Sequence, residues 1–215
     1  SCMKTARMTA DEAGADAPRT RIQKAKREAI NEAGLTVFAR DGYRGATLDR
    51  IATEAGLSKP NLLYYFPSKD AIYEALLTGL LETWLDPLQA LDPAGDPLAE
   101  LLGYVRRKLD LARDYPRESR LFAGEILRGA PQILPVLQTD LRRLVDEQAR
   151  IVQGWVDTGQ IAPVNPHHLI FSVWALTQHY ADFDVQVRAV LGPARDPLAE
   201  AESFLDTLFT RLLAP

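Results

Sequence analysis

Cysteine is almost absent from this chain of 215 residues, because Cys2 is the only one. An intrachain disulfide and a cysteine-based metal cluster are therefore excluded, which favours a reducing compartment. Long apolar runs are missing as well: no stretch approaches the roughly 20 residues that span a bilayer, and residues 1–18 lack the apolar run of a secretory signal. We therefore expect a cytoplasmic protein with no membrane partner.

The signatures of common catalytic sites are also missing. The sequence has no Gly-x-Ser-x-Gly elbow, no phosphate-binding loop and no catalytic cysteine. From the enzyme class we keep one alternative, a small helical hydrolase that would use Asp182 and His179, although nothing supplies an activated nucleophile. His179 with Asp182, or His167 with His168, could suggest a metal, but neither pair belongs to a helically spaced ligand set. We predict no catalytic residue, no metal and no cofactor.

Strand patterns are absent too, whereas helical patterns are frequent. No segment alternates apolar and polar residues, but apolar residues recur at three- and four-residue steps within residues 22–38, 76–88 and 198–212. With 47% hydrophobic and 25% charged residues, the chain is able to bury a core. The predicted fold class is therefore all-α. Residues 1–18 are small, polar and aperiodic, and we expect a disordered N-terminal arm there.

The charge is divided unevenly along the chain. The formal net charge of −4 combines 12 Lys/Arg against 9 Asp/Glu in residues 1–70 with 13 against 20 in residues 71–215. Residues 19–69 alone hold 10 basic and 5 acidic side chains. A basic N-terminal module on an acidic body indicates a polyanion as the partner of the first part. A solvated, charged helix face is the alternative that charge alone leaves open.

Residues 45–69 predict two short helices joined by a sharp turn. Thr47 is a natural N-cap for the first helix, and Gly56 can adopt the left-handed conformation that ends it. Ser58 then caps the second helix, which has Pro60 in its first turn. Such a pair is a helix-turn-helix, whose second helix can lie in the major groove of DNA. A plain helical hairpin would have the same capping pattern.

The second of these helices presents side chains that suit DNA. Lys59 and Asn61 lie near its N-terminus, where they can reach guanine acceptors and the paired groups of adenine. Tyr64 can reach a phosphate, and Thr47 and Lys69 begin flanking helices whose unpaired N–H groups suit phosphate contacts. The candidate DNA-binding residues are Thr47, Ser58, Lys59, Pro60, Asn61, Tyr64, Tyr65 and Lys69.

This region resembles the DNA-binding domain of TetR-family repressors. The resemblance covers residues 20–69: a helix ends in Phe-Ala-Arg-Asp-Gly-Tyr (38–43), a Thr-capped helix follows, and the recognition helix ends in Tyr-Phe-Pro-Ser-Lys (65–69). It implies a helix-turn-helix DNA-binding domain over residues 19–67 with double-stranded operator DNA as its partner. It also implies a helical ligand-binding and dimerisation domain over residues 68–215.

The body resembles those members of the family that regulate pyrimidine utilisation and respond to uracil. The resemblance rests on stretches spread over residues 62–187, above all Thr-Gln-His-Tyr-Ala-Asp-Phe at 177–183, with Arg-Asp-Tyr-Pro at 113–116 and Gly-Trp-Val at 154–156. It implies uracil or a related pyrimidine as the small-molecule effector that releases the repressor from DNA. A repressor of efflux or lipid genes with a larger, more apolar ligand is the closest alternative. A purely architectural DNA binder is another.

A polar cluster at residues 177–182 interrupts an otherwise apolar helix that is predicted from about residue 166 to 190. It can be an internal network, with Gln178 bonded to Asp182, or a ligand site. Because a side-chain amide satisfies a donor and an acceptor together, we expect Gln178 to pair with an imide such as uracil, while aromatic rings stack on the flat ligand. The candidate ligand-binding residues are Trp84, Arg120, Phe122, Glu125, Trp155, Trp174, Thr177 and Gln178.

The helix at 166–190 and the last helix, residues 197–213, are predicted to form a four-helix dimer interface. The first of them is apolar nearly all round, so it must be covered on most sides. A helix buried within one subunit would show the same pattern. Two DNA-binding heads suit a two-fold operator, however, and we therefore expect a homodimer.

Overall fold

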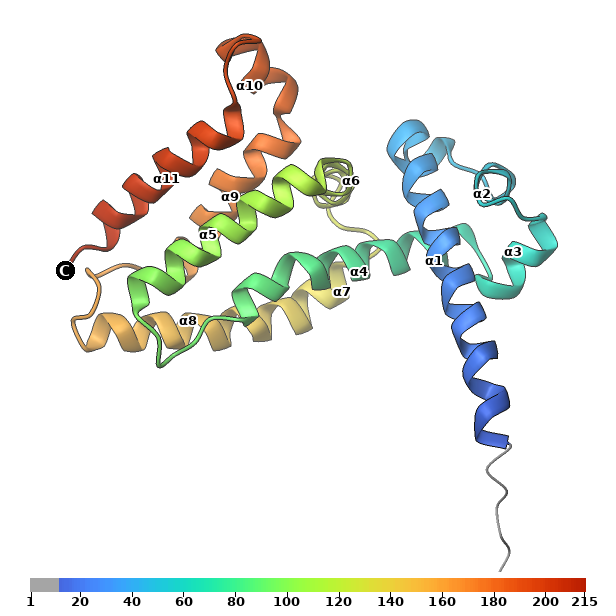
Figure 1. The fold of residues 1–215 in the computed structure, drawn as a ribbon, viewed down its shortest axis with the longest axis horizontal. Coiled ribbons are helices and arrows are strands. Elements are labelled where there is room, and N and C mark those ends of the chain that lie inside the picture. The colour runs from blue at the N-terminus through green and yellow to red at the C-terminus, as the bar shows by residue number, and fades with distance from the viewer. Residues whose placement is uncertain (1–11) are drawn as a thin grey trace, which may run out of the picture. The chain divides into compact units, whose positions relative to one another are not determined.

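The computed structural model describes residues 12–215, with side chains from residue 21 onward. All regular structure in this range is helical, and no strand is present within it (Figure 1). The all-α fold class predicted from the sequence is therefore confirmed. Backbone contacts divide the chain into two compact units, with the division between Leu76 and Leu77. Among the described residues, no helix has both the length and the apolar character that a membrane crossing requires.

The N-terminal unit consists of α1 (Glu12–Gly45), α2 (Leu48–Glu54), α3 (Lys59–Tyr65) and the first turns of α4 (Lys69–Gln89). α1 includes residues 12–18, for which the sequence predicts a disordered arm. Alanine has the highest helix propensity and acidic residues stabilise a helix N-terminus, and both are frequent in this stretch. The remainder of the predicted arm, residues 1–11, lies outside the described residues.

Gly42 interrupts α1 near its end. Its backbone adopts φ 69° and ψ 171°, a left-handed conformation that residues with a Cβ rarely adopt. The Ala46 N–H still donates to the Gly42 carbonyl, at 3.1 Å. The helix is therefore kinked at Gly42 and makes one further turn before the chain enters α2.

Apolar side chains from all four helices form the core of the N-terminal unit. Phe38 of α1, Ile51 of α2, Leu62 of α3 and Tyr73 of α4 are fully buried. The rings of Phe38 and Tyr73 meet edge to face, with centroids 4.8 Å apart. Because the first turns of α4 belong to this core, the division between the units lies inside α4 and not at residues 67/68, where the sequence predicts it.

The C-terminal unit is built from the rest of α4 and the helices that follow it. They are α5 (Pro97–Asp114), α6 (Pro116–Leu127), α7 (Leu134–Val136), the π-helical turn η1 (Leu137–Leu141), α8 (Arg142–Asp157), α9 (Pro166–Asp182), α10 (Asp184–Leu191) and α11 (Pro197–Leu213). α5, α9 and α11 share one start signal, an Asp or Asn N-cap followed directly by Pro. The cap satisfies an unpaired N–H, and proline at the first position loses no helical hydrogen bond.

The main core of this unit lies between α5, α8, α9 and α11, where Leu109, Val152, Leu169 and Leu205 are buried. α9 is shorter than the helix predicted over 166–190. Phe183 leaves the helical conformation, with φ −115° and ψ 27°. Asp184 then supplies an acidic group to the first turn of α10, which favours a new N-terminus there. The predicted single helix is therefore two.

Candidate DNA interface and ligand chamber

The helix-turn-helix forms as the sequence predicts. Thr47 Oγ1 accepts a hydrogen bond from the Arg50 N–H (3.3 Å) at the start of α2, and Ser58 Oγ accepts one from the Asn61 N–H (3.4 Å) at the start of α3. Between the two helices Gly56 has φ 65°, a conformation that is accessible because glycine has no Cβ. Both predicted N-caps and the predicted turn are therefore confirmed.

α3 has one buried and one exposed side. Leu62 is buried in the core of the N-terminal unit, and Phe66, just beyond the helix, is buried with it. The exposed side carries the predicted DNA contacts Lys59, Pro60, Asn61 and Tyr64. It offers an amine, an amide and a phenol, groups that can meet base edges or phosphates. The DNA contacts themselves stay a prediction.

Lys59 forms an ion pair with Asp49 of α2, with Nζ 3.0 Å from the carboxylate. Both side chains are largely exposed, at 46% and 70%, so the pair contributes little to stability. The carboxylate holds the ammonium group at the N-terminal turn of α3 without burying it. Lys59 can therefore exchange Asp49 for a guanine acceptor or a phosphate at small cost.

Lys69 is engaged within the protein. Its Nζ donates to the carbonyl oxygens of Tyr43 (2.8 Å) and Ala46 (3.1 Å) and lies 4.4 Å from the centroid of the Tyr43 ring. A cation at this place satisfies carbonyl groups at the C-terminal end of α1 that have no helical partner. Tyr65 is half-buried and meets Tyr64 edge to face. The geometry thus gives Lys69 a structural role, and the phosphate contacts expected of both residues stay predictions.

A cavity of about 680 Å³ lies inside the C-terminal unit, between α4, α5, α6, η1 and α9. We refer to this cavity as the chamber. Its volume is within the range of about 300–1,000 Å³ that is usual for small-molecule sites. Most of its wall is apolar, with polar groups from α5, α6 and α9. The predicted ligand-binding residues that line it are Trp84, Arg120, Phe122, Trp174 and Gln178.

Glu125, Trp155 and Thr177 were also predicted to bind ligand, but they do not line the chamber. Glu125 accepts hydrogen bonds from the Arg128 side chain (3.0 Å) and from a backbone N–H (2.8 Å) at the end of α6. Trp155 lies in the main core and donates to a backbone carbonyl (3.3 Å). Thr177 is buried, with its hydroxyl bonded to the carbonyl four residues earlier (2.7 Å). Their polar groups are satisfied within the protein.

Lys108, Ser119 and Asp182 line the chamber, although they were not among the predicted ligand contacts. Ser119 Oγ donates to Asp182 Oδ1 at 2.6 Å, and burial raises the pKa of Asp182. Lys108 is only 2% accessible, and burial lowers its pKa to about 7 against the opposing effect of the Asp182 charge. A signal for Lys108 exists in the sequence, because it continues the buried stripe of Leu101 and Val105 at helical spacing.

The walls of the chamber are fixed by contacts with the rest of the unit. Trp174 Nε1 donates to the Tyr104 hydroxyl at 2.7 Å, and burial raises the pKa of Tyr104, so this phenol stays neutral. Lys108 Nζ lies 5.9 Å from the centroid of the Trp84 ring. Arg120 Nη1 donates to a backbone carbonyl of α9 at 3.2 Å and ties α6 to that helix. The chamber is therefore largely preformed, as small-molecule sites usually are.

Gln178 is half-buried in the wall formed by α9. Among the described residues, none hydrogen-bonds to its side-chain amide. The internal pair with Asp182 that the sequence left open is not formed, since Asp182 accepts from Ser119 instead. The Gln178 amide therefore keeps a donor and an acceptor for a ligand.

The histidines of the metal and hydrolase alternatives have other neighbours. His179 is exposed and stacks on Phe183, with ring centroids 5.1 Å apart. His167 Nε2 lies 2.9 Å from a carboxylate oxygen of Asp146. Within residues whose side chains are described, no group of three or more His, Cys, Asp or Glu could hold a metal ion.

Both units match models of bacterial regulators. Residues 30–76 match the model described as bacterial regulatory proteins, tetR family, and residues 77–215 match the model described as YcdC-like protein, C-terminal region. The chain is 51% identical over 174 residues to the HTH-type transcriptional regulator RutR of Escherichia coli strain K12. This match covers 81% of the chain and 82% of RutR.

Solved structures show the same fold. A bacterial regulatory protein in the tetR family from Rhodococcus RHA1 matches with a TM-score of 0.70 at 19% identity, over 88% of this chain and 97% of that one. AibR in complex with isovaleryl coenzyme A and operator DNA matches with a TM-score of 0.65 at 18% identity, over 88% and 99%. Because the two family models together span residues 30–215 and RutR is half identical to it, the chain belongs to the TetR family of bacterial transcriptional regulators.

Proposed function

We propose that the protein is a ligand-responsive repressor of pyrimidine-utilisation genes, released from its operator by uracil or a related pyrimidine. The 51% identity to RutR supports this assignment, together with the exposed side of α3 and the chamber. It acts as a dimeric regulator in the cytoplasm and not as an enzyme. The exposed residues of α3 read the operator, and the chamber takes the effector.

The observation that carries the proposal is that aromatic side chains and a side-chain amide line the same chamber. Trp84 and Trp174 line it together with Gln178. The imide edge of uracil has one N–H between two carbonyl oxygens, so the Gln178 amide matches the N–H and one carbonyl at once. A flat ring stacked on an indole gains about 0.5–1.5 kcal/mol beyond the area that it buries.

The polar side of the chamber supplies partners for the second carbonyl. Lys108 and Arg120 carry N–H donors there, and Ser119 and Asp182 add a hydroxyl and a carboxyl group. A carbonyl left unpaired in an apolar chamber would cost about 1–3 kcal/mol. Cytosine has an amine and a ring acceptor where uracil has a carbonyl and an N–H, and a rotated Gln178 amide can pair with either set. The Arg120 guanidinium only donates, so at the second carbonyl of uracil it pairs with the oxygen but not with the amine that cytosine carries there.

Exposed apolar side chains on α9 and α11 support the dimer. Phe171 of α9 is 46% accessible, and Phe204, Leu208 and Leu212 form a stripe along α11 at four-residue steps. A contiguous exposed apolar surface of this kind marks a protein interface. Pairing with a second copy would bury the stripe and provide two recognition helices, about 34–36 Å apart, for successive major grooves.

Release from DNA requires that the effector binds one conformation of the dimer better than the other. An effector shifts a conformational equilibrium only by its differential affinity for the two states. Operator and effector then weaken each other's binding by the same factor, and a coupling of about 1–3 kcal/mol corresponds to roughly 5–150-fold. Saturating effector is thus expected to lower operator affinity within that range.

A larger, apolar effector is the second candidate. The chamber measures about 680 Å³ and is lined mainly by apolar side chains such as Leu81, Leu137 and Leu141. That volume accommodates a ligand well above a single ring in size. This candidate keeps operator binding and the dimer unchanged and replaces only the ligand.

Calorimetric titration of the purified dimer tests the two candidates directly. We expect uracil and thymine to bind, and cytosine and octanoate not to bind; binding of octanoate without any pyrimidine would select the second candidate. Gln178→Met keeps the length of the side chain but removes the amide, and is expected to weaken uracil binding roughly tenfold or more. Gln153→Met on α8, whose amide bonds to Asp157 at the surface, is the matched control. Equal uracil affinity in both variants would contradict the assignment of Gln178.

A further inference from the structure

The first described turns of α1 carry an excess of positive charge. Residues 21–29, which we name the basic segment, hold Arg21, Lys24, Lys26 and Arg27 against Glu28 as the sole acidic residue. All nine residues are exposed. Among residues whose side chains are described, no carboxylate forms an ion pair with Arg21, Lys24 or Lys26. The charge of the segment is therefore not neutralised within the described part of the chain.

Residues 21–26 of the basic segment have no face that packs on the core. A helix at a protein surface normally buries an apolar stripe, one residue every three or four. Here the first buried residue is Ile30, and Ile22 is 60% accessible. The match to the DNA-binding family model also begins at residue 30. The segment thus extends beyond what the fold of the N-terminal unit requires, and packing gives no reason for its composition.

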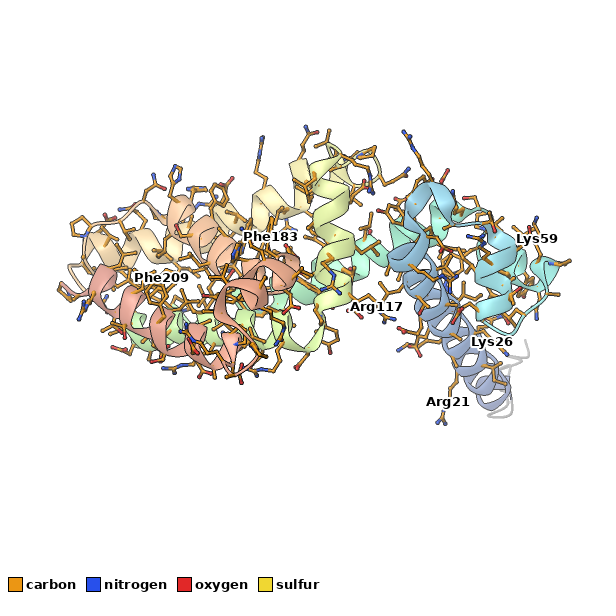
Figure 2. The ribbon with its side chains drawn as sticks, turned by 90° about the horizontal axis from the view of Figure 1, so that it is seen from above. Arg21, Lys26, Lys59, Arg117, Phe183 and Phe209 are labelled. Atoms are coloured by element: carbon orange, nitrogen blue, oxygen red, sulfur yellow. The ribbon has the colours of Figure 1, made fainter. Side chains whose placement is uncertain are left out.

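Arg27 joins the basic segment to the recognition helix. Its Nη1 donates to the Tyr65 carbonyl at 2.7 Å, and its guanidinium lies 4.2 Å from the centroid of the Phe66 ring. The segment therefore extends away from the core of the N-terminal unit, starting beside the C-terminal end of α3. Arg21, Lys24 and Arg27 are three residues apart and therefore lie along one side of α1. Figure 2 shows the Arg21 side chain reaching away from the ribbon of α1.

We propose that the basic segment is a second DNA-binding surface, which contacts phosphates of the duplex beside the stretch that α3 reads. The inference rests on the proposed operator binding by α3. Nine helical residues extend about 13 Å, and a duplex carries one phosphate per strand for roughly every 3.4 Å of its axis, so a row of phosphates lies within reach of the segment. Arginine and lysine on one helix side suit that row, since phosphate contacts fix position and need no sequence match. The segment adds affinity for DNA without adding specificity.

The salt dependence of DNA binding tests the proposal. The double variant Arg21→Gln/Lys24→Gln is compared with Arg142→Gln/Arg150→Gln, which removes the same charge from exposed positions of α8. The probe is a duplex that the wild-type protein selects from a random-sequence library, and binding is measured by fluorescence anisotropy at several salt concentrations. Each lost phosphate contact lowers the slope of log K against log salt by about 0.9. Because the dimer carries two copies of each residue, the Arg21/Lys24 variant is expected to lose roughly 3.6 and the α8 variant nothing.

The length of the flanking DNA provides a second readout. With longer flanks on the selected duplex, the wild-type protein gains affinity and the Arg21/Lys24 variant does not. Equal slopes and equal flank effects in all three proteins, with operator binding intact, would overturn the inference and leave the proposed function standing. A wild-type protein that selects no duplex would overturn the proposed function and the inference with it. Because Arg21 and Lys24 are exposed, circular dichroism melts of the variants are expected to match wild type.

Discussion

Replacing Lys108 with methionine is expected to remove a pH dependence from the stability of the protein. Lys108 is buried in the wall of the chamber, and its main charged neighbour is Asp182 of α9. Arg120 of α6 adds a further positive charge to the same wall. Desolvation outweighs the attraction of the carboxylate, which is why the pKa of Lys108 falls. Methionine has a similar length and no charge to desolvate.

The sign and size of the effect follow from the two pKa values. The pKa of Lys108 is about 7 in the folded chain and 10.5 in its unperturbed state. Between these values the unfolded chain holds more protons than the folded chain, so the free energy of unfolding rises with pH. The slope approaches 1.4 kcal/mol per pH unit, and the full difference is about 5 kcal/mol. Relative to Lys108→Met, the wild-type protein should gain roughly 2–3 kcal/mol between pH 7 and 9.

Urea denaturation at pH 6, 7, 8 and 9 measures this difference. Lys108→Met is expected to be the more stable protein at pH 6, and the gap should narrow as the pH rises. Lys26→Met, at an exposed position, is the control and should differ from wild type by a constant amount. Titrations shared by all three proteins cancel in the comparison. A difference between wild type and Lys108→Met that does not change with pH would refute the reasoning.

Three further predictions concern the DNA interface, the dimer and the core of the N-terminal unit. Asn61→Ala should weaken binding to the selected duplex by about 1–3 kcal/mol per half-site and relax specificity at one base pair in each half-site; uniform weakening on all duplexes in anisotropy titrations would argue against a base contact. Phe204→Glu places a charge in the exposed stripe of α11 and should convert dimers to monomers in sedimentation velocity, whereas an unchanged dimer would show that the interface lies elsewhere. Lys69→Met removes two hydrogen bonds to carbonyl groups of the α1 end and should lower the free energy of unfolding by about 1–3 kcal/mol. Urea denaturation measures this change, and an unaltered free energy of unfolding would contradict the structural role of Lys69.

The DNA-binding unit could be predicted closely because its signals are local. Thr47 and Ser58 each cap a helix by accepting a hydrogen bond from the backbone N–H three residues later. Gly56 adopts the left-handed conformation that the turn requires. Such features depend on a few neighbouring residues and can be read without the fold. The boundary of the unit could not be predicted in this way. It depends on the packing of Tyr73 against Phe38, which is known only once α1 and α4 are placed together.

The chamber could be predicted only in part, since helical periodicity does not separate a core face from a cavity face. Trp155 and Trp174 look alike in the sequence, yet the first fills the main core and the second lines the chamber. Glu125 was expected to face a ligand, but it bonds within the turn after α6. Lys108 was missed because lysine usually marks solvent, although its spacing on α5 places it among buried residues. Resolving these cases requires the packing of several helices together.

The π-helical turn η1 forms part of one wall of the chamber and sets the register of the helix that follows it. Leu137 and Leu141 bound this turn, and both line the cavity. A π turn bonds i to i+5 and so holds one residue more than an α turn, and such turns are frequent at functional sites. A switch of this turn to the α pattern would rotate the following side chains by about 100° around the helix. That rotation would carry the buried side chains of α8, such as Val152, out of the core that they share with α9. The π turn therefore fixes the register of α8 together with the position of Leu137 and Leu141, and amide hydrogen exchange at residues 137–141 should be faster than in α8.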